Sequence, residues 1–243
     1  MRTLVTGASG FVGKHLLQHL PDAFALTRDR ADLRKPLPPL PPADVVFHCA
    51  GVIDEVNDMQ AVNVEGTRRL IDWAVASRVK TFVLLSTGGV TGEGPYAESK
   101  RAAEDIARAA GALIDVQIVR LFFPYGPGQS AKRLVPRLIA NVRAGVPIRV
   151  TGDGPMLSLT FIDDVIDGLL RISGVAGSHV VDLGGPALSM REIGTAIGAV
   201  LGVAPRFESG TGGTHWIADS DALRALTGHA PETPLLDGLR RSV

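Results

Sequence analysis

The feature that most constrains this chain is the glycine-rich stretch near its beginning, Thr6-Gly-Ala-Ser-Gly-Phe-Val-Gly13. An apolar run precedes it and an amphipathic pattern follows it, so the sequence predicts a buried strand, a tight turn and a helix. Gly7 permits the turn, Gly10 lets a ligand approach the backbone, and Gly13 lets the helix lie close to the sheet. The N–H groups at the start of the helix would then face an anion, most simply a pyrophosphate. A glycine turn without a ligand is the alternative.

The overall composition favours a protein that acts on small molecules. The 243 residues suffice for one large domain or for one domain with a small additional lobe, and an apolar content of 45% supports a sizeable core. Lysine plus arginine equals aspartate plus glutamate at 25 each, so no net charge favours nucleic acid or an anionic membrane as a partner. The single cysteine, the lack of a signal-type segment and the lack of a membrane-length apolar run indicate a cytoplasmic protein.

Strand and helix patterns alternate along the first half of the chain. We expect strands over residues 23–27, 43–51, 81–87 and 115–122, and helices over 59–79 and from Tyr96 onward. This alternation predicts an α/β fold with a doubly wound parallel sheet of the Rossmann type. We assign residues 1–128 to this dinucleotide-binding domain.

The second half of the chain has a different pattern. We expect residues 129–243 to form a small C-terminal α/β substrate lobe, interleaved with the first domain, and to close the substrate pocket. The expected elements are a basic helix over 131–145, a strand over 147–150, a helix from Phe161, a strand over 180–184, and short helices over 189–202 and 219–226.

Two segments that follow the second expected strand also carry information. An acidic residue about twenty positions past the glycines holds the ribose hydroxyls of NAD, whereas an arginine suits the 2′-phosphate of NADP. Arg28 therefore favours NADP over NAD, although Asp29 beside it weakens the signal and a solvated loop charge is the alternative. The proline-rich segment Lys35–Pro42 predicts a stiff, extended connector, with a Pro-x-x-Pro ligand for a partner domain as the alternative.

Tyr96 and Lys100 lie four residues apart at the start of an expected helix, so both side chains can point at the same ligand. Oxidation of an alcohol needs a base beside the carbon that faces the nicotinamide. A free tyrosine has a pKa of about 10, and we expect the ammonium of Lys100 and the oxidised nicotinamide to lower it. Asn63, early in the 59–79 helix, is expected to bond either the backbone or the cofactor, with a surface asparagine as the alternative.

Several motifs in the same order resemble the extended short-chain dehydrogenase/reductases and, more narrowly, the NAD-dependent epimerase/dehydratase family. They are the glycine turn, His48-Cys-Ala-Gly51, Asn63-Val-Glu-Gly-Thr67, Ser86-Thr87, Tyr96-x-x-x-Lys100 and Arg120-Leu-Phe-Phe-Pro-Tyr-Gly-Pro127. The resemblance continues through Gly152-Asp-Gly154, Phe161-Ile-Asp-Asp164, Asp219, Leu226-Thr-Gly228 and Pro231.

The resemblance implies roles for individual residues. Tyr96, Lys100 and Thr87 would be catalytic, and Ser86 is the second choice for the catalytic hydroxyl. The residues expected to bind the cofactor are Gly7, Ser9, Gly10, Phe11, Val12, Gly13, Arg28, Asp32, Leu33, Cys49, Ala50, Gly51, Asn63, Ser86, Tyr96, Lys100, Phe122, Phe123 and Pro124. Thr87 and Gly88 would contact the substrate, and no metal site is expected. From their charge, Lys132, Arg133, Arg137 and Arg143 could bind a diphosphate of the substrate, and Arg133 is the predicted contact; a solvated helix face is the alternative.

The resemblance implies an NAD(P)-dependent enzyme, most simply a nucleotide-sugar epimerase that works by transient hydride transfer. Glycines rather than acidic residues follow Thr87, which disfavours 4,6-dehydration. Two departures weaken the nucleotide-sugar interpretation, because Phe123 replaces an asparagine and Leu157 or Ser158 replaces an arginine. An NADP-dependent reductase or dehydrogenase of a smaller compound and a non-catalytic dinucleotide-binding regulator are the alternatives. The resemblance also implies a homodimer.

Overall fold

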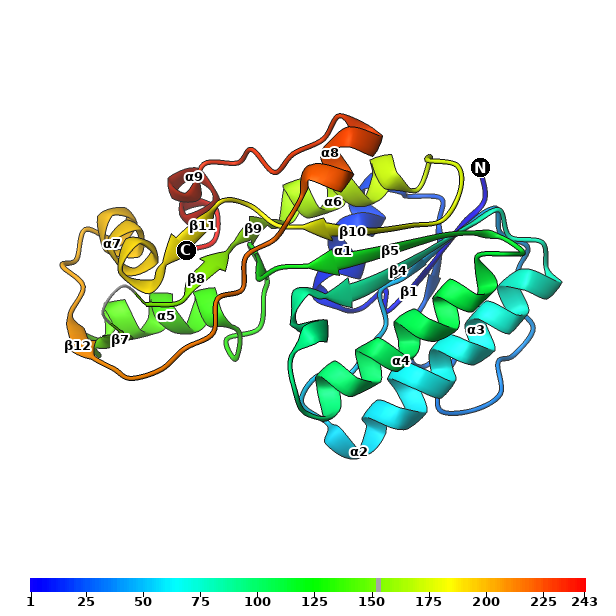
Figure 1. Cartoon of the computed structure of the whole chain (residues 1–243), viewed down its shortest axis with the longest axis horizontal. Coiled ribbons are helices and arrows are strands. Elements are labelled where there is room, and N and C mark those ends of the chain that lie inside the picture. Colours follow the sequence, from blue (N-terminus) through cyan, green and yellow to red (C-terminus); the bar gives the residue numbers. More distant parts are fainter. Residues whose placement is uncertain (152–153) are drawn as a thin grey trace.

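Six parallel strands form the central sheet of the computed structural model, which describes residues 1–151 and 154–243 (Figure 1). Across the sheet they are β2 (Phe24–Leu26), β1 (Thr3–Thr6), β3 (Val45–His48), β4 (Thr81–Thr87), β5 (Asp115–Leu121) and β10 (His179–Leu183). Each neighbouring pair is parallel. The strand order changes direction between β1 and β3, and ligands of such sheets bind beyond the carboxyl ends at this switch point. The prediction of a doubly wound parallel sheet is confirmed.

Helices cover both faces of the sheet, as Figure 1 shows. One face carries α2 (Val56–Met59), α3 (Glu65–Ala76) and α4 (Pro95–Ala110), and the other carries α1 (Phe11–His19), α6 (Ile162–Ile172) and α8 (Asp221–Thr227). Successive strand residues alternate between the two apolar layers: Val46 packs with the layer under α3 and α4, and Phe47 packs with the other. The continuous apolar strands of the sequence follow from this burial on both faces.

The proline-rich segment Lys35–Pro42 connects β2 to β3 with neither helix nor strand. Its two leucines, Leu37 and Leu40, pack against the apolar layer under α3 and α4, while Pro38 and Pro39 are exposed. The segment therefore covers part of the core, which favours the connector over the docking ligand.

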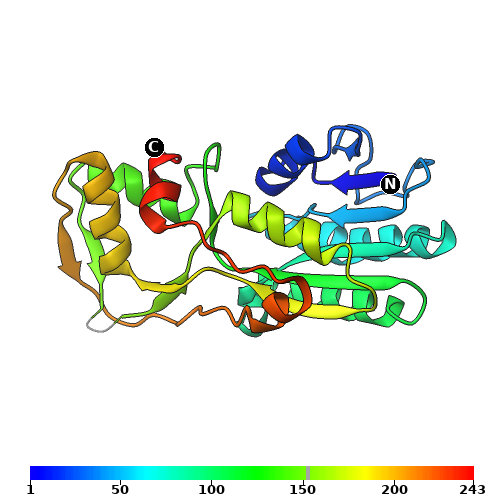
Figure 2. The ribbon, with the colours of Figure 1, turned by 90° about the horizontal axis from the view of Figure 1, so that it is seen from above.

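The C-terminal half contributes to the sheet as well as to a separate lobe. β10 and α6 join the sheet and its helical layer, and Figure 2 shows the lobe at one end of the sheet. The remaining elements are β6 (Pro124–Tyr125), α5 (Leu134–Arg143), β7 (Ile148–Val150), β8 (Met156–Ser158), β9 (Thr160–Phe161), β11 (Ala187–Ser189), α7 (Met190–Leu201), β12 (Phe207–Ser209) and α9 (Leu235–Arg240). They include three two-stranded pairs, β6–β9, β7–β12 and β8–β11. The domain boundary at residue 128 stays a prediction.

Two expected helices differ from those in the structure. The helix expected over 131–145 begins only at Leu134, because Arg133, at the N-cap position, has an extended backbone. Lys132 and Arg133 therefore lie before the helix. The helix expected over 59–79 is divided into α2, a π-helical turn over Gln60–Val64, and α3. π-Helical turns are frequent at functional sites, and the apolar spacing of the sequence does not reveal them.

Two further expectations concern residues or properties outside these elements. Gly152 and Asp153 of the Gly152-Asp-Gly154 motif lie outside the described residues. Among the helices of residues 1–151 and 154–243, none has the length and apolar character needed to cross a bilayer.

Candidate cofactor and substrate site

The glycine turn lies at the carboxyl end of β1, at the switch point of the sheet. Gly7 has φ = +62°, and a Cβ there would lie 2.6 Å from the backbone nitrogen of Ala50. A Cβ on Gly13 would collide with the carbonyl oxygen of Gly7. Gly10 precedes α1, and no side chain in the described part of the chain caps this helix. The N–H groups of its first turn are therefore available to an anion.

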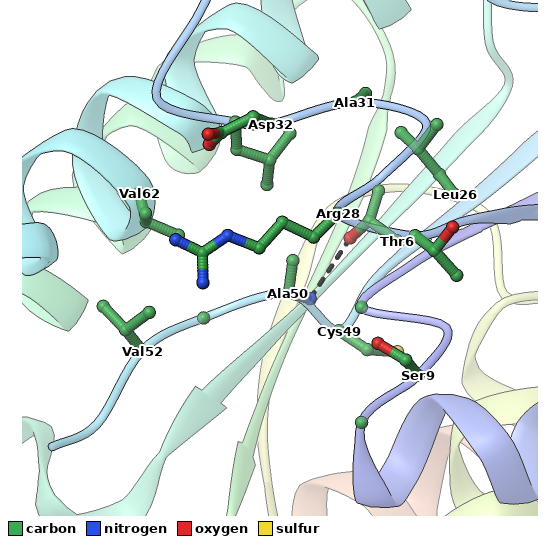
Figure 3. A pocket seen from close by; sticks show the side chains of 15 residues that line it. Thr6, Ser9, Leu26, Arg28, Ala31, Asp32, Cys49, Ala50, Val52 and Val62 are labelled. Atoms are coloured by element: carbon green, nitrogen blue, oxygen red, sulfur yellow. Dashed lines mark hydrogen bonds between the residues drawn. The ribbon is translucent and has the colours of Figure 1, made fainter. Parts of the chain in front are cut away.

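A first cavity of about 220 Å³ opens beyond β1 and β2 (Figure 3). The predicted cofactor residues that line it are Gly7, Ser9, Gly10, Arg28, Asp32, Leu33, Cys49, Ala50 and Gly51. The sequence did not indicate Ala31, Val52 or Val62, whose apolar side chains complete the wall. A cavity with apolar walls beside an uncapped helix start suits a flat ring attached to a phosphate.

Arg28 is the cation of this cavity. Its side chain extends across the opening towards Val62 in Figure 3 and is 66% exposed, and its guanidinium lies 3.8 Å from the carboxylate of Asp58. The Asp32 carboxylate is engaged by Arg34 at 2.7 Å, and hydrogen bonds from Arg34 lower the pKa of Asp32. The cavity thus presents a largely exposed guanidinium beside a carboxylate that is already paired.

A second, larger cavity of about 710 Å³ continues from the first, since Gly10, Cys49, Ala50 and Gly51 line both. The other predicted site residues that line it are Phe11, Val12, Gly13, Ser86, Thr87, Gly88, Tyr96, Lys100, Phe122, Phe123, Pro124 and Arg133. The three residues predicted to be catalytic therefore meet at one cavity, which continues from the glycine turn.

Asn63 is the predicted cofactor residue whose amide is committed elsewhere. It is buried, its Oδ1 accepts from the Val52 N–H at 2.9 Å, and its Nδ2 donates to the Val52 carbonyl at 2.9 Å and to Ser99 Oγ at 3.0 Å. The structure thus favours the backbone alternative, in which Asn63 fixes the segment that follows β3.

Lys100 and Tyr96 project from the first two turns of α4. The buried Nζ of Lys100 donates to the carbonyl of Leu85 at 2.6 Å, and burial lowers the pKa of Lys100 to about 8, with Glu104 opposing the shift. Burial raises the pKa of Tyr96, and the charge that opposes this rise is Arg133. We expected Lys100 to lower the pKa of Tyr96; in the structure Arg133 has this effect and burial outweighs it.

Comparison with known proteins identifies the family. Residues 3–184 match the NAD dependent epimerase/dehydratase family. The chain belongs to this family. It is 28% identical to the UDP-glucose 4-epimerase of Mycolicibacterium smegmatis, with 100% of this chain and 97% of that protein covered.

Solved structures agree over the same length. MoeE5 in complex with UDP-glucuronic acid and NAD is 27% identical with a TM-score of 0.84, covering 100% of this chain and 97% of that one. RMD from Pseudomonas aeruginosa complexed with NADPH is 26% identical with a TM-score of 0.83, covering 99% and 98%. The predictions of family membership and of an NAD(P)-dependent enzyme are confirmed.

The two candidate hydroxyls of this family member have different surroundings. Ser86 Oγ donates its proton to Glu104 at 2.6 Å, so that proton is not free for a substrate. Thr87 Oγ1 accepts from the Gly89 N–H at 3.1 Å, which leaves its own proton available. The arrangement favours Thr87 over Ser86 as a donor to substrate.

Glu104 anchors this end of the site. It is 1% exposed, and both oxygens are occupied by Ser86, Arg120 and Arg108, with the two arginines at 2.7 Å. The sequence did not indicate it, although it lies one helical turn beyond Lys100. Together with the bond from Lys100 to Leu85, it holds α4 against the end of β4.

Three cavity residues from the second half of the chain, Gln129, Ser130 and Trp216, were not predicted. They come from segments that tertiary packing alone brings beside β4, so local sequence patterns carry no signal for them. Lys132 and Arg133, which the basic pattern suggests for a diphosphate, also line the cavity, and Arg133 reaches across to Asp54 at 3.1 Å.

Proposed function

We propose that this protein is an NAD(P)-dependent nucleotide-sugar epimerase with Tyr96 as its acid/base. The observation that carries the proposal is the meeting of Tyr96, Lys100 and Thr87 at a cavity of about 710 Å³ that continues from the dinucleotide cavity. Cavities of roughly 300–1,000 Å³ accommodate ligands of this size. The epimerase from Mycolicibacterium smegmatis and the MoeE5 complex support the same substrate class.

The residues of the first cavity fit the cofactor that the family implies. Gly7 lets the turn pack against the backbone of Ala50, Gly13 lets α1 lie against the turn, and Gly10 lines the cavity without a side chain. The uncapped start of α1 matches a pyrophosphate. When bound, the nicotinamide supplies the redox chemistry by accepting a hydride and returning it.

The side chains of the second cavity divide the remaining tasks. In its phenolate form Tyr96 takes the proton of the sugar hydroxyl and later returns it. Arg133 opposes the rise in the pKa of Tyr96 that burial causes, and the positive charge of the oxidised nicotinamide would favour the phenolate further when the cofactor is bound. Thr87 donates to the same substrate oxygen and fixes its orientation, because its Oγ1 is itself held by the Gly89 N–H. Arg133 and Lys132 supply positive charge for a diphosphate. Since an epimerase returns the sugar to its original oxidation level, the cavity needs no further acid, which agrees with the glycines after Thr87.

Replacing Tyr96 with phenylalanine tests the catalytic assignment. Turnover of UDP-glucose or UDP-glucuronic acid, followed by NMR, should fall by about 10²–10⁴-fold, because the acid/base is lost. Cofactor affinity should stay nearly unchanged. The chain has one other tyrosine, Tyr125, which is buried in the apolar layer on the α1 and α6 side, so Tyr125→Phe is the matched control and should keep its turnover. Undiminished turnover in Tyr96→Phe would refute the assignment.

We also propose that the protein uses NADP or NAD and that it favours NADP. Support comes from the exposed guanidinium of Arg28, the engaged carboxylate of Asp32, and the family neighbour complexed with NADPH, whereas MoeE5 contains NAD. Arg28→Ala should weaken NADPH binding about tenfold or more, the cost of a lost charged hydrogen bond, and leave NADH binding nearly unchanged. Arg30→Ala, two residues away and bonded to the Ala25 carbonyl, is the control. Equal binding of both cofactors, unaltered in Arg28→Ala, would contradict the preference.

A reductase of a smaller carbonyl compound is the second candidate. Phe123 stands at φ = +36°, an uncommon conformation for a bulky residue, and adds an apolar wall to the cavity. Stoichiometric NADPH consumption would identify the reductase, whereas an epimerase shows no net change in cofactor.

Two further parts of the proposal concern the cellular location and the oligomeric state. A cytoplasmic location is supported by the single cysteine. A homodimer through α3 and α4 is the arrangement that family resemblance implies, and the molecular mass in solution tests it.

A further inference from the structure

Trp216 brings a large aromatic side chain from the C-terminal half into the wall of the second cavity. It lies in the segment between β12 and α8, and two backbone hydrogen bonds fix it to β8. Its N–H donates to the Met156 carbonyl at 2.8 Å, and its carbonyl accepts from the Ser158 N–H at 2.9 Å. The indole is therefore attached to a strand of the lobe rather than to a free loop.

The benzo edge of this indole faces the turn that follows β4. A Cβ built on Gly89 would lie 3.7 Å from Cζ3 and 3.8 Å from Cη2 of Trp216, and one built on Gly92 would lie 3.2 Å from Cη2. The N–H of Gly89 is the donor that holds Thr87 Oγ1. The indole thus lies beside the Thr87 hydroxyl, which we propose donates a hydrogen bond to the reacting oxygen of the substrate.

The chemistry of the cavity differs between its sides. Lys132 and Arg133 supply cations at the start of α5, whereas Trp216 supplies a flat, uncharged surface beside Thr87. The C–H face of a sugar ring packs favourably on such a surface, and a diphosphate does not. The ring that carries the reacting hydroxyl must therefore pass next to the indole.

We propose that Trp216 is a substrate-binding residue that packs against the sugar ring of the nucleotide sugar. The proposal rests on the proposed function, because it names the same substrate. It assigns to the C-terminal half the recognition of the reacting ring, in addition to the charge supplied by Arg133.

Fluorescence provides a direct test, because the chain has only two tryptophans. Trp73, on α3, packs against the apolar layer on the opposite side of the sheet from α1 and α6. Trp73→Phe therefore leaves Trp216 as the sole tryptophan reporter. With the protein saturated with oxidised cofactor, UDP-glucose or UDP-glucuronic acid should change the emission of Trp216, and UDP alone should change it much less.

Kinetics provide a second readout. Trp216→Leu should raise KM for the nucleotide sugar by about three- to tenfold, the value of an aromatic contact, with a smaller effect on kcat, and Trp216→Phe should restore most of the loss. Turnover with unchanged Trp216 emission and an unchanged KM in Trp216→Leu would overturn the inference while leaving the proposed function intact. Failure of the natural protein to turn over any nucleotide sugar would overturn the proposed function, and this inference with it.

Discussion

The Lys100→Met variant is expected to be inactive and yet to fold more stably than the natural protein near neutral pH. Lys100 is buried, and burial lowers its pKa from 10.5 to about 8. A lowered lysine pKa means that the folded state binds the proton more weakly than the unfolded state does. The charged side chain therefore opposes folding at every pH at which it is charged in both states.

The size of this cost follows from the pKa shift. The pKa falls from 10.5 to about 8, and at about 1.4 kcal/mol for each pH unit this gives roughly 3.5 kcal/mol, of which we count about 3 kcal/mol. The cost is fully present below about pH 8 and disappears as pH rises through the folded pKa towards the unfolded value. Methionine removes the charge, but it leaves the Leu85 carbonyl without its hydrogen-bond donor, and this loss destabilises the variant by about 1 kcal/mol. The expected net gain is about 2 kcal/mol, and Glu104 keeps its bonds to Ser86, Arg108 and Arg120.

Urea unfolding at two pH values measures this gain. The variant should be about 2 kcal/mol more stable near pH 7, and the difference should shrink towards zero near pH 9.5, where the natural lysine is neutral in the folded state. Lys35→Met, at an exposed site in the proline-rich segment, should change stability by less than about 0.5 kcal/mol. A variant that is no more stable near pH 7, or whose gain does not fall with pH, would refute the reasoning.

Two further predictions concern the glycine turn and the hydroxyls at the end of β4. Thr87→Val should reduce turnover by about 10²-fold with little loss of stability. Ser86→Ala should keep its turnover and should lower the free energy of unfolding by about 1 kcal/mol, because Glu104 loses the hydrogen bond from Ser86. Kinetics and urea unfolding measure the two effects, and the opposite pattern would assign the catalytic hydroxyl to Ser86. Gly13→Ala should weaken cofactor binding and cost about 1–3 kcal/mol, because its Cβ collides with the Gly7 carbonyl. Gly174→Ala, where a Cβ has an ordinary contact of 3.6 Å, is the control, and equal effects at both glycines would contradict the close packing of α1.

The sheet, the glycine turn and the Tyr96–Lys100 pair could be predicted because the sequence patterns that indicate them are local. Apolar strands such as Val45–His48 are buried on both faces, and the Tyr96–Lys100 spacing places both side chains on one helical face. The position of Trp216 and the pairing of Arg133 with Asp54 depend on segments far apart in the chain, so no local pattern reveals them. The burial of Glu104 likewise depends on Arg120 of the neighbouring strand β5.

The participation of β10 in the central sheet restricts how the substrate lobe can move. The chain leaves the sheet after β5, returns through α6 and β10, departs again into β11 and comes back as α8, so several polypeptide connections join the two regions (Figure 2). Rotation about a single hinge would have to deform all of these connections at once. We therefore expect substrate to enter through local adjustments at the rim of the cavity rather than through a wide opening of the lobe.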